Sequence, residues 1–237
     1  MAISGLALVV SIVSAVIGQI QEKKQLRISV REQLSSVVQD LISSQAEYAM
    51  LYPEPPEKRD SAYGVKMGTL NHKLTSLARQ ACALDKLDGE VGFDVQFIAI
   101  ANALATSGDQ PTAEEYFEKA VARSPSVYYR SINLTLFGTF LFNQSQPEKG
   151  RRIFADAAAA LPLASDFNRM TVSRAYQAWC IAEAWNDPAS GVRADECYQN
   201  AQRILQGIKS DPMRKACLRD LEQATGRMPA GEPQPPS

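Results

Sequence analysis

An internal repeat constrains the fold of this 237-residue chain more than any other sequence feature. The spacing A-x3-F-x2-A-x4-P occurs first at Ala113, Phe117, Ala120 and Pro125. It returns at Gly150, Phe154, Ala157 and Pro162, and again at Ala194, Tyr198 and Ala201, where Gln206 replaces the proline. Residues three and four apart share one face of a helix, so each copy predicts a helix with small residues where a second helix crosses it.

A second apolar set lies upstream of each copy. The three sets are Phe97, Ile100, Ala101 and Leu104; Leu134, Phe137, Gly138 and Leu141; and Ala178, Ile181, Ala182 and Trp185. Each set again has helical spacing, so the sequence predicts three helix pairs. No run of alternating β-branched residues competes with these helices, and the predicted fold class is all-α.

These motifs resemble the tetratricopeptide repeat (TPR), whose two antiparallel helices carry W-x2-L-G-x2-Y and A-x3-F-x2-A-x4-P. The resemblance covers about 94–127, 131–164 and 175–208. It implies a solenoid of helix pairs, in which the first helices line a concave groove that binds an extended peptide or a partner helix.

The resemblance also implies which residues face that groove. We expect two asparagines to bond to a partner's backbone and the aromatic side chains to supply apolar contacts. The candidate partner-binding residues are Asn102, Thr139, Phe142, Asn143, Tyr176, Trp179 and Glu183. The alternative is that residues 22–86 of the same chain fill the groove and that the aromatic side chains belong to the core.

An uncharged segment opens the chain: no ionisable side chain occurs from Met1 to Gln21. A helix of about 20 residues is about 30 Å long, the thickness of a bilayer's hydrocarbon core. No basic stretch precedes the segment, as a signal peptide would require, so residues 1–21 are predicted to be a retained transmembrane anchor. The alternatives are an uncleaved signal-like segment of a secreted protein and a helix buried in the fold.

The flanking charges predict the orientation of this single-pass anchor. Lysine and arginine near a span are retained on the cytoplasmic side. The basic residues directly after the segment are Lys23, Lys24, Arg27 and Arg31. The repeat domain is therefore predicted to be cytoplasmic, and the four cysteines agree, since they form no CxxC motif. The alternative is an extracytoplasmic domain with the opposite orientation.

Small residues follow one stripe of the predicted anchor. They are Ser4, Ala7, Ser11, Ser14 and Gly18. Such a stripe lets a second helix approach closely, so it is a candidate face for self-association in the membrane. The alternative is that small residues are merely tolerated in an anchor that does not self-associate.

The predicted organisation has four parts. Residues 1–21 form the anchor, and 22–90 form a helical hairpin that is interrupted by prolines at 53, 55 and 56. Residues 91–226 hold the repeats and a C-terminal capping helix from about 212 to 225. The proline-rich segment 227–237 is predicted to be disordered.

Composition and motifs argue against catalysis. The net charge is −1 and His72 is the only histidine, so hydrolytic triads, common zinc sites and a nucleic-acid-binding basic surface are not expected. No phosphate-binding loop, HExxH or GxSxG motif occurs, so we expect no enzyme, cofactor or metal. The sequence favours a membrane-anchored adaptor or scaffold; the alternative is a self-associating structural membrane protein.

Overall fold

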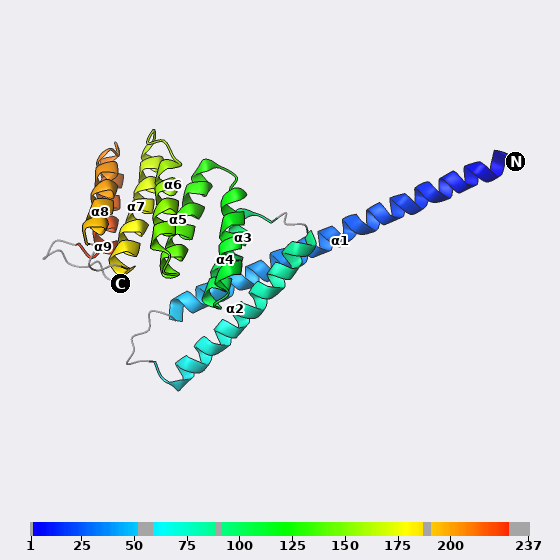
Figure 1. Ribbon diagram of the computed structural model, residues 1–237, viewed down its shortest axis with the longest axis horizontal. Coiled ribbons are helices and arrows are strands. Elements are labelled where there is room, and N and C mark those ends of the chain that lie inside the picture. Colours follow the sequence, from blue (N-terminus) through cyan, green and yellow to red (C-terminus); the bar gives the residue numbers. More distant parts are fainter. Residues whose placement is uncertain (1, 52–58, 89–91, 187–190, 228–237) are drawn as a thin grey trace. The chain divides into compact units, whose positions relative to one another are not determined.

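The computed structural model describes the backbone of residues 2–51, 59–88, 92–186 and 191–227, with side chains from Gln21 onward except Asp88. Every element in this described part is an α-helix (Figure 1), so the all-α prediction is confirmed there. Among the residues whose side chains the structure describes, from Gln21 onward, no helix is both long and apolar enough to cross a bilayer. The chain divides into two compact units, Met1–Gly92 with Ala99–Ala113 and Phe93–Ile98 with Glu114–Ser237.

The first unit is built on a helical hairpin. Helix α1 (Ala2–Leu51) and helix α2 (Ser61–Asp88) lie side by side and run in opposite directions (Figure 1). The buried side chains of the hairpin are Val30, Leu34, Val37, Val38 and Leu41 on α1 and Leu70, Leu74, Ala78, Ala81 and Leu84 on α2. They recur every three or four positions, which keeps them on one face of each helix.

Burial along α1 begins at Val30, and residues 21–29 are all exposed. At 1.5 Å per residue, about 14 Å of exposed helix precedes the hairpin core. Further along α1, the amide of Gln45 donates to the carbonyl of Ala99 at 2.9 Å. This bond joins α1 to the part of helix α3 (Asp94–Thr106) that belongs to the same unit.

The second unit consists mainly of antiparallel helix pairs. Helix α4 (Gln110–Ala122), which belongs to this unit from Glu114 onward, is followed by α5 (Val127–Asn143), α6 (Pro147–Ala159), α7 (Asp166–Asn186), α8 (Gly191–Gln206) and α9 (Asp211–Ala224). Helix α5 packs on α6 and α7 packs on α8, while α7 also contacts α5 and α6. Helix α9 packs on α7 and α8, and its Leu221 joins a core cluster with Leu205 of α8 and with Ile208, which follows α8.

The α5–α6 pair and the α7–α8 pair each contain a buried hydrogen bond between their two helices. In the first of them, the Ser131 hydroxyl donates to the carbonyl of Ala157 at 2.8 Å. In the next, the Ser173 hydroxyl donates to the carbonyl of Ala201 at 3.4 Å. Ser173 is therefore the structural equivalent of Ser131.

Stacked aromatic rings also show which residues of α5 and α7 are structurally equivalent. Phe117 of α4 stacks on Phe137 of α5, with ring centroids 5.6 Å apart and planes 7° apart. Phe154 of α6 stacks on Trp179 of α7, with centroids 5.9 Å apart and planes 7° apart. Helix α7 thus contacts α6 through a stacked ring pair like the one that joins α5 to α4.

These contacts correct the predicted register of α7. Ser173 and Trp179 each lie 42 positions after their equivalents on α5. The residues that match Leu134, Phe137, Gly138 and Leu141 are therefore Tyr176, Trp179, Cys180 and Glu183, rather than Ala178, Ile181, Ala182 and Trp185. The cause is a longer connection, because 28 positions separate Ser173 from Ala201 and 26 separate Ser131 from Ala157.

Candidate partner-binding site

Two of the predicted groove residues line a depression between α5 and α7. Its volume is about 330 Å³, and its lining residues are Thr139, Asn143, Ala178, Ile181, Ala182, Trp185 and Asn186. Because α5 and α7 are the first helices of their pairs, this is the face on which the repeat pattern predicts a groove. Ile181, equivalent to Thr139 in the corrected register, lies beside it in this depression.

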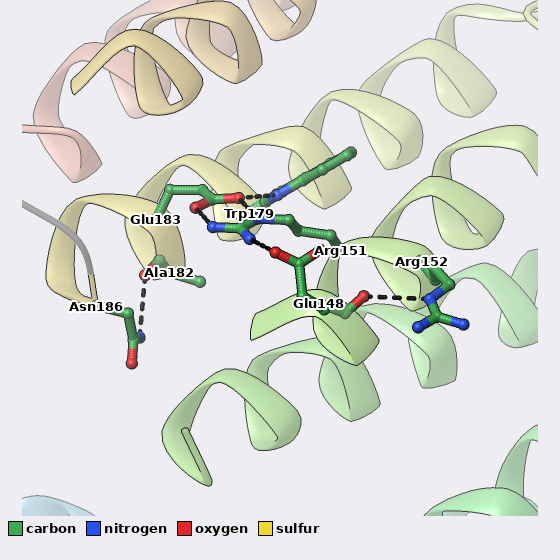
Figure 2. A network of polar contacts seen from close by, with 7 residues as sticks. All are labelled: Glu148, Arg151, Arg152, Trp179, Ala182, Glu183 and Asn186. Atoms are coloured by element: carbon green, nitrogen blue, oxygen red, sulfur yellow. Dashed lines mark hydrogen bonds and ion pairs between the residues drawn. The ribbon is translucent and has the colours of Figure 1, made fainter. Parts of the chain in front are cut away.

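The lining combines an apolar surface with amide and hydroxyl groups. The Thr139 hydroxyl donates to the carbonyl of Thr135 at 3.0 Å, so it is held by its own helix. Asn186 donates to the carbonyl of Ala182 at 3.0 Å (Figure 2). Asn143 is exposed, and its side chain makes no hydrogen bond within the described residues, which leaves its amide available to a partner.

Trp185 is the most exposed large hydrophobic side chain in the described part of the chain, at 82%. A tryptophan can bury about 150–250 Å² of surface in a contact, so this side chain offers a large apolar contact area. The sequence pattern placed Trp185 in the helix-pair core. The two-residue difference in register is the reason that it lies on the surface instead.

The remaining predicted groove residues of this unit lie elsewhere. Tyr176, Trp179 and Glu183 line a separate depression of about 410 Å³, which also includes Arg151, Ala155, Ala158, Ala159, Arg193, Glu196, Cys197 and Asn200. Phe142 is completely buried and packs against Phe154 with ring centroids 5.7 Å apart, so it is a core residue and not a groove contact. The predicted groove set is thus divided between two surfaces and the core.

Two other predicted features are not brought to this site. Asn102 belongs to the first unit, where its side chain is exposed. The stripe Ser4, Ala7, Ser11, Ser14 and Gly18 lies on α1, but its side chains are outside the described part of the structure, as is the segment 228–237. The predicted anchor and self-association face therefore stay predictions.

Two residues that line the second depression, Arg151 and Glu183, form a buried ion pair. Figure 2 shows this pair and its hydrogen-bond partners. Arg151 of α6 donates from Nε to Oε1 of Glu183 at 2.7 Å and from Nη2 to Oε2 at 2.8 Å. Trp179 donates from Nε1 to the same Oε1 at 2.9 Å, and Arg151 also donates to Glu148. The Glu183 carboxylate is fully buried, and these donors satisfy it.

The pKa of Glu183 follows from this balance. Burial alone would raise the pKa, but the hydrogen bonds from Arg151 and Trp179 and the positive charge of Arg151 outweigh burial and lower it. The same hydrogen bond to Glu183 raises the pKa of Arg151. Both groups therefore stay ionised at neutral pH, and the pair holds α6 against α7.

The two buried cysteines are not activated nucleophiles. Cys180 and Cys197 are buried in one cluster with Ala194, and burial raises the pKa of both thiols, that of Cys197 to about 12. A thiol with a raised pKa carries little thiolate and reacts slowly. In the described part of the chain, no three His, Cys, Asp or Glu side chains are grouped so that they could hold a metal ion.

The sequence patterns missed Ile181, Trp185 and Arg151 as residues of these two depressions. The sequence signal that could have predicted the exposure of Trp185 is the connection between α7 and α8, which is two residues longer than the one between α5 and α6. No local signal connects Arg151 with Glu183, because they are 32 positions apart and meet only when α6 packs on α7. Comparison with protein-family models, curated proteins and solved structures finds no match to this chain.

Proposed function

We propose that this chain is a membrane-anchored adaptor whose TPR-like helix pairs bind a protein or peptide partner. The observation that carries the proposal is the depression between α5 and α7, lined in part by the exposed Trp185. An open, largely apolar depression with a few polar groups is the usual form of a recognition site. Tryptophan is among the residue types that most often dominate binding energy at an interface.

The lining favours an uncharged stretch of the partner. None of the seven lining residues is ionisable. An apolar side chain of the partner would cover Ile181 and Trp185, and a backbone amide or carbonyl would bond to Asn143. Partner charges would add little at this surface, so we expect binding to depend weakly on salt.

The membrane part of the proposal is supported by the sequence. The uncharged run ends at Gln21 inside the continuous helix α1, and basic residues follow at 23, 24, 27 and 31. This arrangement favours a single-pass anchor with the repeat unit on the cytoplasmic side. The adaptor would then hold its partner at the membrane surface.

Site-specific photo-cross-linking in membranes tests the binding surface. A photoreactive phenylalanine analogue in place of Trp185 is expected to form an adduct with the partner. The same analogue in place of Val192, which is 70% exposed on α8 and outside the depression, serves as the matched control. Asn143→Ala is expected to reduce the adduct at position 185.

Equal adducts from positions 185 and 192 would contradict the proposed surface, as would an adduct at 185 that Asn143→Ala leaves unchanged. Circular dichroism on each purified variant checks that the helical fold is retained. Because both side chains are largely exposed, neither replacement should disturb the core.

A further inference from the structure

Helix α1 carries a basic face between the uncharged run and the hairpin core. This basic face consists of Lys23, Lys24, Arg27 and Arg31, all exposed. With 3.6 residues per turn, these four positions fall within about 100° of arc around the helix. The nearby acidic residues Glu22 and Glu32 fall outside that arc, so the positive charge is concentrated on one side.

The described chain leaves three of these cations without a partner. Lys23, Lys24 and Arg27 make no hydrogen bond or ion pair with any described residue. Like charges four positions apart, such as Lys23 and Arg27, destabilise a helix. An external anion that binds the basic face would remove this repulsion.

We infer that the basic face binds the anionic headgroups of phospholipids. The inference rests on the proposed anchor, because Lys23 lies only about 3 Å along the helix beyond Gln21, where the uncharged run ends. Side chains on an α-helix tilt toward its N-terminus, so these lysines and arginines point back toward the membrane. Their long aliphatic stems let the charged groups reach the headgroup layer, which is about 5–7 Å thick in each leaflet.

The exposed stretch of α1 makes this contact sterically feasible. The hairpin core begins only at Val30, so α2 does not cover the cations at positions 23, 24 and 27. An orientation signal alone requires cations near the span but no particular side of the helix. Their concentration on one face favours a local cluster of anionic lipid beside α1.

The test uses the full chain reconstituted into phosphatidylcholine vesicles that contain about 20% phosphatidylserine. After extraction in a mild non-ionic detergent, mass spectrometry measures the ratio of the two lipids that remain bound. We expect phosphatidylserine to be enriched about fivefold over the vesicle, which corresponds to about 1 kcal/mol. Salt at about 0.5 M should reduce the enrichment.

Two triple variants of equal charge change separate the basic face from charge in general. Lys23→Gln, Lys24→Gln and Arg27→Gln together should return the ratio to that of the vesicle. The matched control replaces three exposed cations of α2, with Lys73→Gln, Arg79→Gln and Lys86→Gln, and should keep the enrichment. Enrichment that persists in the first variant overturns the inference.

Anchoring is measured separately in vesicles of phosphatidylcholine alone. A chain that alkaline carbonate removes from these vesicles overturns the anchor, and this inference with it. A chain that resists carbonate but binds the two lipids in the vesicle's own ratio overturns the lipid inference alone. In that case the basic face would be assigned to an acidic protein surface.

Discussion

The α5–α6 and α7–α8 helix pairs fill one equivalent buried position with opposite chemistry. Leu141 and Glu183 each lie four positions after the stacked ring of their helix, Phe137 and Trp179 respectively. Both side chains are 0% exposed. The position is apolar in one pair and ionised in the next.

This difference shows what a buried carboxylate requires at a position that leucine fills in the other helix pair. Burying an unpaired charge costs several kcal/mol, so Glu183 depends on donors that the preceding helix pair supplies through Arg151. The two parallel Arg151–Glu183 hydrogen bonds also admit one geometry, whereas an apolar contact tolerates sliding. The ion pair therefore fixes how α7 sits on α6.

Breaking the ion pair should have the largest effect. Arg151→Ala leaves the Glu183 carboxylate buried without its main donor, and we expect unfolding free energy to fall by about 3–5 kcal/mol. Urea denaturation measures the change. The exposed neighbour Arg152 is the matched control, and Arg152→Ala should cost less than about 0.5 kcal/mol. Equal costs would show that Glu183 does not depend on Arg151.

Replacing the ion pair by apolar side chains sharpens the comparison between the α5–α6 and α7–α8 pairs. Glu183→Leu combined with Arg151→Met gives α7 the chemistry of α5, and replacing a buried ion pair by apolar residues is often neutral or stabilising. We therefore expect the double variant to regain most of the stability that Arg151→Ala loses. A double variant as unstable as Arg151→Ala would mean that Leu141 and Glu183 do not occupy comparable surroundings.

Glycine at the helix crossing is the next difference. In the α5–α6 pair, a Cβ added at Gly150 would collide with the ring of Phe142. The equivalent residue of the α7–α8 pair is Ala194. Gly150→Ala should cost about 1–3 kcal/mol by overpacking. Gly138→Ala should cost less, because its Cβ would lie 3.0 Å from the ring of Phe154. Thermal denaturation of the two variants compares them, and the reverse order would contradict the packing of Phe142.

The shared serine hydrogen bond should give a smaller effect. Ser131→Ala removes a bond of 2.8 Å between buried groups and should cost about 1 kcal/mol. Ser173→Ala removes a bond of 3.4 Å and should cost less. Denaturation midpoints at a constant m-value measure both. A larger loss from Ser173→Ala would show that the longer bond carries more of the pairing energy.

Acidification should give the smallest effect over the range pH 7 to 4. The folded-state pKa of Glu183 lies below its usual 4.5, so its contribution is complete above that value and is lost as pH falls through the folded pKa. At pH 4 the loss is at most about 1 kcal/mol. The Glu183→Leu, Arg151→Met variant should lack this contribution. Parallel pH profiles for the two proteins would contradict the assigned ion pair.

The sequence predicted much of the secondary structure and less of the site. The α5 and α6 residues Phe137, Gly138, Gly150 and Phe154 lie at the helix crossing that their spacing implied, because that spacing is a local property of each helix. On α7 the apolar residues fit two registers, and the pattern favoured the wrong one. Of the predicted groove residues, Thr139 and Asn143 line the depression between α5 and α7, whereas Phe142 and Trp179 do not.

The sequence by itself determined the helical character of the chain, its repeated small residues and the charge boundary at Gln21. These follow from periodicity and composition, which act within one helix at a time. Only the tertiary structure decided that Glu183 is buried against Arg151 and that Trp185 is exposed. Both outcomes depend on the register of α7 relative to α6 and α8. That register is set by contacts between residues far apart in the chain.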